Sequence, residues 1–271
     1  MMEQSLGNGA VLCSLDARGV ATVSLNRPDV NNAYNGDMLD GLHAAMDLVD
    51  AQPGIRVVVL RGNGRHFQAG ADLAWIAEVG KRGADANLAA SRLTGEAVQR
   101  LNLLRVPTVA LVNGGCFGGG TGVVAACDVV IAAEDAIFAI TEARWGLMAG
   151  IILPHLCHAI GVRNVRRYAL TCERFGAHAA ERLGLVHEVC RLDELAARGE
   201  QLVDALLMNA PEALALTKRR TLAVSGNDLS AELMDLLISE HAARRQTAEA
   251  AEGTASFLQK RHPSWYPGPR D

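Results

Sequence analysis

Residues 109–128 read VALVNGGCFGGGTGVVAACD, and this stretch decides how the rest of the chain is interpreted. An apolar run ends at Asn113, six glycines follow up to Gly122, and a second apolar run begins at Val123. This order predicts a strand, a tight turn and a helix. Glycine is required where backbone adopts positive φ or approaches another group closely, and the first amides of a helix lack intrahelical partners. We therefore expect this turn to present N–H donors to an oxygen that becomes negative during a reaction.

Two other interpretations of the glycines remain open from the sequence. In the first, the glycines serve only to let a helix pack closely on a sheet. Alternatively, Gly120-x-Gly122-x-x-Ala125 fits a short form of the dinucleotide-binding fingerprint. That fingerprint expects an acidic residue at a strand end about 20 positions later, whereas Glu134 and Asp135 are typical of a turn.

Composition limits the classes of protein that the chain can represent. It has 271 residues, of which 49% are hydrophobic and 21% charged, with a formal net charge of −4. We expect one large domain, or one with a small appendage. No long basic block indicates a nucleic-acid or membrane partner, and no apolar run is long enough to span a bilayer. The N-terminus lacks the features of a signal peptide, so a cytoplasmic protein is expected.

Cysteines and histidines give no clear site. The six cysteines are scattered without a C-x-x-C pair, as expected for small buried apolar residues. Cys116 lies within the glycine turn, but no histidine is linked to it by a sequence motif that would favour a nucleophile. His155 and His158 lack a third ligand at an obvious spacing, which disfavours a metal site.

Alternation and helical periodicity predict an α/β architecture on both sides of the glycine stretch. Strands 11–15 and 20–25 form a hairpin signature around a turn at residues 16–19. The pattern continues with a helix over residues 38–49, a buried strand over 55–60, a helix from Leu73, a polar loop over 81–87 that we expect to be mobile, a helix to about Leu104, and strands at 129–132 and 137–140. Repeated ββα units are therefore predicted.

The C-terminal part of the chain is predicted to be helical. After a strand at residues 186–189, helical patterns cover residues 193–208, 211–222 and 229–259. This divides the chain into a core of residues 1–200 and a helical oligomerisation region of residues 201–271. The apolar stripe of these helices needs a partner, which we expect to be a neighbouring subunit.

Four separated motifs resemble the crotonase (enoyl-CoA hydratase/isomerase) superfamily. They are LNRPDVNNAY, HFQAGADLAWI, GGCFGGGTGVVAACD with the following FAITEARWGL, and EGTASFLQKRHPSW, in the order and spacing of that family. The resemblance implies a spiral of ββα units with a helical C-terminal trimerisation region. It also implies an acyl-CoA thioester substrate and a homotrimer or dimer of trimers.

The resemblance also implies the reacting groups. The backbone N–H groups of Ala71 and Gly119 would form an oxyanion hole that stabilises a thioester enolate. Glu142 would be the catalytic carboxylate. Hydratases of the family often have a second glutamate at the position of Gly122, so this chain departs from the pattern. Hydration by a single glutamate, a Δ3,Δ2 double-bond shift, and acyl-CoA binding without turnover all remain open.

The bacterial branch that this chain most resembles acts on branched glutaconyl-CoA thioesters, namely 3-methylglutaconyl-CoA of leucine breakdown and isohexenylglutaconyl-CoA of terpene breakdown. The small residues Ala149 and Gly150 favour the longer isohexenyl chain. Such substrates carry a second carboxylate, for which Arg144 is a candidate partner. Trp75 and Trp145 are candidates for the wall of the acyl pocket.

Binding of the CoA moiety is likewise implied by the resemblance. Val30, Ala33, Ala69 and Asp72 would contact it, and Lys260 would reach a phosphate. Coenzyme A is then part of the substrate, and no metal, flavin or nicotinamide cofactor is implied.

Overall fold

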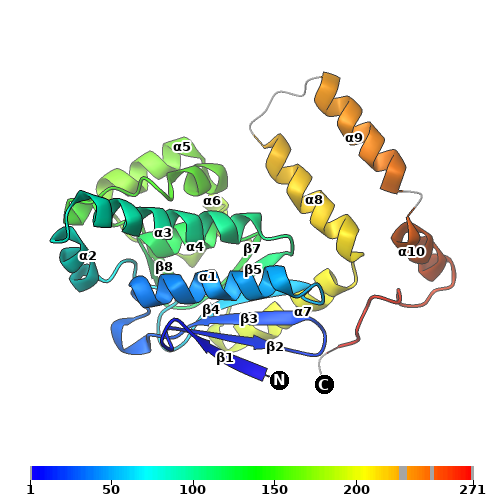
Figure 1. Cartoon of the computed structure of the whole chain (residues 1–271), viewed down its shortest axis with the longest axis horizontal. Coiled ribbons are helices and arrows are strands. Elements are labelled where there is room, and N and C mark those ends of the chain that lie inside the picture. Colours follow the sequence, from blue (N-terminus) through cyan, green and yellow to red (C-terminus); the bar gives the residue numbers. More distant parts are fainter. Residues whose placement is uncertain (1, 226–230, 245–246, 270–271) are drawn as a thin grey trace.

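The computed structural model describes residues 2–225, 231–244 and 247–269, and within them the chain forms two sheets surrounded by helices (Figure 1). The strands are β1 (Met2–Leu6), β2 (Val11–Leu15), β3 (Val20–Leu25), β4 (Val57–Gly62), β5 (Thr108–Val112), β6 (Gly115–Phe117), β7 (Val129–Ala133), β8 (Ile137–Ala139), β9 (Phe175–Gly176) and β10 (Glu188–Cys190). The helices are η1 (Pro28–Val30), α1 (Gly36–Ala51), α2 (Leu73–Gly80), α3 (Ala84–Leu103), α4 (Gly119–Ala125), η2 (Glu142–Trp145), α5 (Leu153–Thr171), α6 (Ala177–Leu183), η3 (Leu192–Glu194), α7 (Leu195–Leu207), α8 (Pro211–Val224), α9 (Ala231–Arg244) and α10 (Ala248–Leu258).

The larger sheet has the strand order β1-β2-β3-β4-β5-β7-β10. Its first three strands are antiparallel, and pairing from β3 through β10 is parallel. The smaller sheet has the order β6-β8-β9, and β6 belongs to the glycine stretch. The predicted α/β class and the hairpin of β2 and β3 are confirmed. The pairing of β1 with β2 was not predicted.

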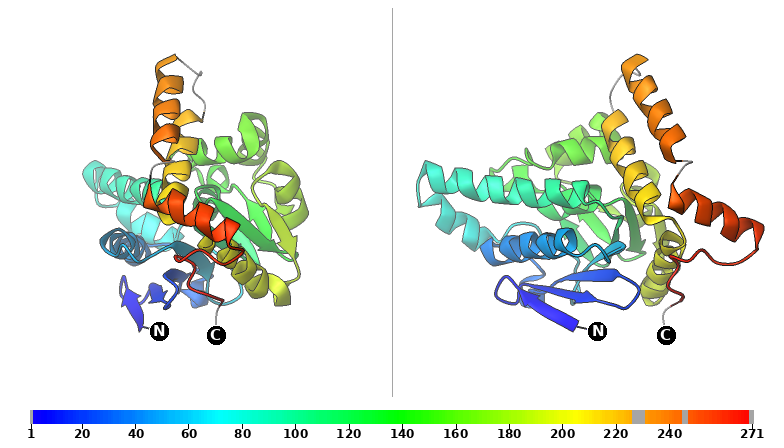
Figure 2. Two further views of the ribbon diagram at one scale, coloured as in Figure 1. Left: turned by 90° about the vertical axis from the view of Figure 1, so that its right-hand side faces the viewer. Right: turned by 45° about the vertical axis from the view of Figure 1, so that its right-hand side comes forward.

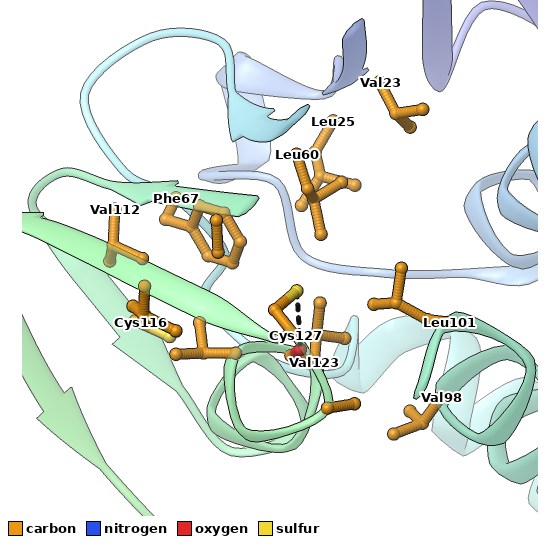
Figure 3. Packing of buried hydrophobic residues seen from close by; sticks show 14 of the residues in the cluster. Val23, Leu25, Leu60, Phe67, Val98, Leu101, Val112, Cys116, Val123 and Cys127 are labelled. Atoms are coloured by element: carbon orange, nitrogen blue, oxygen red, sulfur yellow. Dashed lines mark hydrogen bonds between the residues drawn. The ribbon is translucent and has the colours of Figure 1, made fainter. Parts of the chain in front are cut away.

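The central strands are buried on both faces because their side chains alternate between two layers of helices. Val58 and Leu60 of β4 belong to the main core, which includes residues of α1 and α3, whereas Val57 and Val59 belong to the cluster against α7. Figure 3 shows the part of the main core around the glycine stretch, where Cys127 donates its thiol to the carbonyl oxygen of Val123 at 3.4 Å. The glycine stretch is thus anchored in the centre of the molecule.

Two predictions about helix boundaries were wrong. The polar segment 81–87 was expected to be a loop, but α3 begins at Ala84, so residues 81–83 alone separate α2 from α3. The side chain of Asn87 donates to the carbonyl oxygens of Val79 and Gly83, which ties this helix start to α2. The predicted helix 229–259 is divided into α9 and α10, and residues 229–230 and 245–246 lie outside the described residues.

The C-terminal helices separate from the core after α7. Val203 and Leu207 of α7 are buried against the sheet, so the boundary predicted between residues 200 and 201 lies inside a helix that belongs to the core. Beyond it, α8, α9 and α10 extend away from the sheets (Figures 1 and 2). Apolar side chains on the last two helices are exposed, including Ile238 at 58% and Phe257 at 82%.

Helix α4 packs closely on the start of α5, and this contact fixes the residue type at position 122. A Cβ atom on Gly122 would lie 2.2 Å from Cγ2 of Ile152, and Ile152 is itself buried. No side chain larger than hydrogen fits there unless Ile152 moves. The space in which a glutamate at position 122 would begin is therefore occupied by an aliphatic side chain.

We expect Gly122→Ala to lower the free energy of unfolding by about 2 kcal/mol, because overpacking in a closely packed core is destabilising. Gly95→Ala is the matched control, since Gly95 is also helical and its nearest neighbour would be 3.6 Å away. That control should raise stability by about 0.5 kcal/mol through helix propensity. Chemical denaturation of both variants measures the difference. In the double variant Gly122→Ala/Ile152→Ala, the loss of stability should be smaller than the sum of the losses in the two single variants. Additive losses would contradict the contact between positions 122 and 152.

Candidate active site

The site is built where the loop after β4 runs parallel to the glycine stretch. The amide of Gln68 donates to the carbonyl oxygen of Gly115 at 3.1 Å, and the amide of Phe117 donates to the carbonyl oxygen of Gln68 at 2.9 Å. Gln68 is therefore paired with Cys116 in a parallel register. Further along the two loops, a Cβ atom on Gly70 would lie 3.7 Å from the Cα atom of Gly118, and Ala71 and Gly119 are the next residues of each loop.

Within the described part of the chain, the two amides at these positions have no backbone acceptor. Tyr34 donates its amide to the carbonyl oxygen of Gly70 at 2.8 Å and accepts from the amide of Asp72 at 2.9 Å. In such a parallel bridge the amide of the intervening residue, Ala71, points away from Tyr34. Gly119 is the first residue of α4, so its amide has no intrahelical acceptor. Both residues line the same cavity.

Close approach of the two loops depends on glycine. Gly70 has φ +86, and a Cβ atom on it would lie 3.0 Å from the carbonyl oxygen of Phe117. Gly118 has φ +50, and its amide donates to the carbonyl oxygen of Ala139 at 2.8 Å. A side chain at either position would be strained; at Gly70 it would also push the loops apart, and at Gly118 it would meet the side chains of Thr141 and Glu142. The predicted strand, tight turn and helix are present, with the short strand β6 inside the turn as an addition.

Glu142 reaches this turn from η2, which follows β8. Its Oε1 atom lies 3.2 Å from the position of a Cβ on Gly118. Its Oε2 atom is buried and has no hydrogen-bond partner among the described residues. Burial raises the pKa of the Glu142 carboxyl above its ordinary value of 4.5, and hydrogen bonds from the backbone oppose this rise. The carboxylate is thus desolvated, close to the glycine turn and available to a bound molecule.

The cavity that these groups share has a volume of about 610 Å³ and extends between α1 and α3 into the core. Its deep part is lined by aliphatic side chains such as Met46, Val49 and Leu101. Among the residues that line it, Glu142 alone has a charged side chain. A cavity of this kind suits an uncharged apolar group whose polar end meets a few fixed polar atoms.

The structure brings some of the other predicted residues to this cavity. Ala69, Trp75 and Trp145 line it together with Ala71, Gly119 and Glu142. Trp75 is packed edge-on against Tyr34 with ring centroids 6.0 Å apart, whereas Trp145 is 56% exposed at the rim.

The remaining predicted residues do not line the cavity. Asp72 accepts from the amides of Ala74 and Trp75 and forms an ion pair with Arg27, so it caps the start of α2. Val30 ends η1, and Ala33 follows it; the carbonyl oxygen of Ala33 accepts from Arg27, the same side chain that pairs with Asp72.

Arg144 and Lys260 were predicted to bind anionic parts of a ligand, but the structure places them elsewhere. Arg144 donates from its guanidinium to the carbonyl oxygen of Cys172 at 3.2 Å, outside the lining of the cavity. Lys260 follows α10, which lies on the side of the molecule opposite α2 (Figure 1). Proximity in sequence to Glu142 therefore did not make Arg144 a pocket residue in this chain.

Tyr34, Gln68 and Ile152 are among the lining residues that the sequence did not indicate. Gln68 is 1% exposed, and its Oε1 atom has no hydrogen-bond partner among the described residues. Burial, with the charge of Glu142 as a second cause, raises the pKa of Tyr34 to about 12. Gln68 lies in the same motif as Ala71, and Tyr34 ends the motif LNRPDVNNAY, but neither has a residue type that singles it out as catalytic.

Other interpretations of the sequence receive no support. The thiol of Cys116 is fully buried, and burial raises its pKa well above the ordinary value, so it is not a nucleophilic thiolate. In the described part of the chain, no three His, Cys, Asp or Glu side chains cluster as a metal site would require. Across the same residues, no helix combines the length and apolar character needed to span a bilayer.

Comparisons with known proteins agree with this architecture. Residues 16–267 match the family described as enoyl-CoA hydratase/isomerase. The structure of Pseudomonas aeruginosa AtuE is 36% identical, with a TM-score of 0.91 over 95% of this chain and 99% of that one. An enoyl-CoA hydratase from Shewanella pealeana is 32% identical, with a TM-score of 0.90 over 94% and 96% of the two chains. The mevalonyl-coenzyme A hydratase of Aspergillus fumigatus is 31% identical over 94% of each chain.

The family match covers nearly the whole chain. The similar solved structures have the same fold as this chain. The chain belongs to the enoyl-CoA hydratase/isomerase family and has the crotonase fold.

Proposed function

We propose that this protein adds water across the 2,3 double bond of an enoyl-CoA thioester. The observation that carries the proposal is the close contact of two turns, in which Gly70 lies against Phe117 and Gly118. Ala71 and Gly119 are the next residues of each turn, and the carboxylate of Glu142 lies over Gly118. Ala71, Gly119 and Glu142 line one cavity. Membership of a family that includes hydratases supports the same reaction.

The two amides would act on the thioester carbonyl oxygen. When water attacks C3, the electrons of the double bond move toward this oxygen, which becomes negatively charged. Two donors fixed by backbone pairing need no reorganisation at that moment, and each such donor is typically worth about 3 kcal/mol of barrier. Ala71 and Gly119 are held by neighbouring backbone hydrogen bonds rather than by mobile side chains.

Glu142 would move the proton. Its carboxylate takes a proton from water as the oxygen of that water bonds to C3, and it then delivers a proton to C2. One water O–H bond and the carbon–carbon π bond break, and a C3–O bond and a C2–H bond form. The raised pKa of Glu142 suits this exchange, because a general base and acid works best when its pKa is not far from the working pH.

For the acyl group, we propose a branched glutaconyl-type thioester with a long apolar arm, as in isohexenylglutaconyl-CoA. The cavity of about 610 Å³ with aliphatic walls supports a long arm better than the methyl branch of 3-methylglutaconyl-CoA. The second carboxylate of such a substrate finds no cation in the lining. It would therefore have to remain near the rim at Trp145, in contact with solvent.

A Δ3,Δ2-enoyl-CoA isomerase is the second candidate. One carboxylate lines the cavity, and a single base suffices to move a proton between C2 and C4 without water.

A binding protein without turnover is a third candidate. It would have no use for a buried carboxylate whose Oε2 atom lacks a partner, since an unpaired buried charge is costly to keep.

Absorbance at the enoyl-thioester band distinguishes these candidates. We expect loss of signal with crotonyl-CoA, 3-methylglutaconyl-CoA and isohexenylglutaconyl-CoA, with the largest kcat/KM for the last. A gain of signal with a 3-enoyl-CoA, together with no loss for the others, would establish isomerisation instead. No change with any thioester would leave binding alone.

Replacement of the carboxylate provides the matched control for this assay. Glu142→Gln should lower kcat by about 1,000-fold, because positioned acid–base groups typically contribute factors of about 10² to 10⁴. Glu134→Gln should leave the rate unchanged, since Glu134 is exposed on the turn between β7 and β8. A Glu142→Gln variant with most of its rate would remove this residue from the mechanism.

The raised pKa of Glu142 predicts the acid limb of the pH profile. The base must be ionised, so kcat/KM should be constant at higher pH and should fall as the pH decreases through the raised pKa. The midpoint should lie above 4.5, the ordinary value for a glutamate. A limb at or below 4.5 in initial-rate measurements with crotonyl-CoA would show that burial does not raise this pKa.

We also propose that the protein assembles as a trimer or a dimer of trimers. The exposed apolar side chains of α9 and α10, among them Ile238 and Phe257, support burial against another subunit. Sedimentation velocity at micromolar concentration should then give a mass of three or six chains. A stable monomer would contradict this assembly.

A further inference from the structure

Hydration requires a second group beside Glu142. The attacking water must be held with a lone pair toward C3 while one of its hydrogens points at the base. Glu142 can accept one hydrogen of this water, but the other needs a separate acceptor. Position 122 cannot supply it, because Ile152 occupies the adjoining space.

The three consecutive glycines at residues 118–120 are each covered by a different polar side chain. A Cβ on Gly118 would lie 3.2 Å from Glu142 Oε1, one on Gly119 would lie 2.8 Å from Tyr34 Cε1, and one on Gly120 would lie 2.9 Å from Gln68 Oε1. The charge of Glu142 contributes to the raised pKa of Tyr34, so the carboxylate and the phenol lie near each other. Glu142 lies over Gly118, and Tyr34 lies over Gly119. The peptide bond between these two glycines contains the N–H group of Gly119.

Tyr34 is held more firmly than an ordinary loop residue. Its backbone binds the residues on both sides of Ala71, at 2.8 Å to Gly70 and 2.9 Å to Asp72. Its ring packs against Trp75. The same residue therefore positions the Ala71 amide through its backbone and places a phenol in the cavity through its side chain.

We propose that Tyr34 is a further catalytic residue, whose hydroxyl oxygen accepts the second hydrogen of the attacking water and orients this water toward C3. The inference rests on the proposed hydratase function. Tyr34 keeps its own proton throughout, and Glu142 takes the proton that leaves the water. The pKa of about 12 for Tyr34 agrees with this division, because a phenol of that pKa stays neutral at physiological pH.

Tyr34→Phe tests the inference, because it removes the hydroxyl and retains the ring against Gly119 and Trp75. Two reactions are measured on the same preparation: hydration of crotonyl-CoA, and exchange of the C2 hydrogens of butyryl-CoA in D₂O by mass spectrometry. Exchange needs the two amides and Glu142 but no oriented nucleophile. We expect kcat for hydration to fall about 100-fold, the magnitude typical of a misplaced reactant, while KM and the exchange rate stay within about twofold.

Tyr168→Phe is the control for loss of a buried tyrosine hydroxyl outside the cavity, where the Tyr168 ring packs on Phe175 at 4.2 Å between centroids. It should retain both rates. Hydration by Tyr34→Phe within twofold of the unchanged protein would overturn the inference and leave the hydratase function intact. Equal losses of hydration and exchange would also overturn it, because they indicate a structural role. An unchanged protein that exchanges C2 hydrogens but hydrates no thioester would overturn both proposals.

Discussion

The site depends on one short stretch of parallel pairing between Gln68 and Cys116. Two backbone hydrogen bonds, at 3.1 and 2.9 Å, fix the register of the two loops just before the turns that contain Ala71 and Gly119. Glycine at position 70 has positive φ and leaves no room for a Cβ beside Phe117, and glycine at position 118 has positive φ and lies against the side chain of Glu142. The side chain of Glu142 adds the proposed acid–base group to these two backbone turns.

Among the residues that line the cavity, Glu142 alone is charged, and this isolation determines its pKa. The cavity is lined by aliphatic and aromatic side chains, so a carboxylate there loses solvation that no cation replaces. The raised pKa and the unpartnered Oε2 atom are two consequences of the same burial. Burying the Glu142 carboxylate costs free energy. A bound thioester and water would offset this cost by supplying its missing hydrogen-bond partners.

Local patterns in the sequence were sufficient to predict most elements of the fold. Alternation gave the hairpin of β2 and β3, and the glycine stretch between two apolar runs gave the turn before α4. Strand β6 was missed because its three residues, Gly115–Phe117, form a strand through pairing with β8 and not through their own propensity. The start of α3 at Ala84 was missed for a similar reason, since side-chain contacts of Asn87 stabilise a polar helix start.

The site could be predicted only where a motif fixes the backbone. Ala71, Gly119 and Glu142 were found because glycine-rich turns and the resemblance specify them, and the structure gathers them in one cavity. The position of Arg144 depends on the carbonyl oxygen of Cys172, which lies 28 residues away in the chain. The sequence around Arg144 therefore does not indicate this contact. Tyr34 was missed because its significance comes from contacts with Gly119 and Trp75, which only the folded chain reveals.

The absence of a second carboxylate is consistent with the surrounding residues. Two carboxylates in an apolar cavity repel one another, and the pKa of at least one then rises strongly. Ile152 beside Gly122 and the phenol of Tyr34 beside Gly119 fill the same region without adding a charge. A neutral hydroxyl can accept a hydrogen bond from water and leave Glu142 as the single ionised group. In the proposed mechanism, Tyr34 and Glu142 therefore supply the polar contacts to water while the rest of the cavity stays apolar.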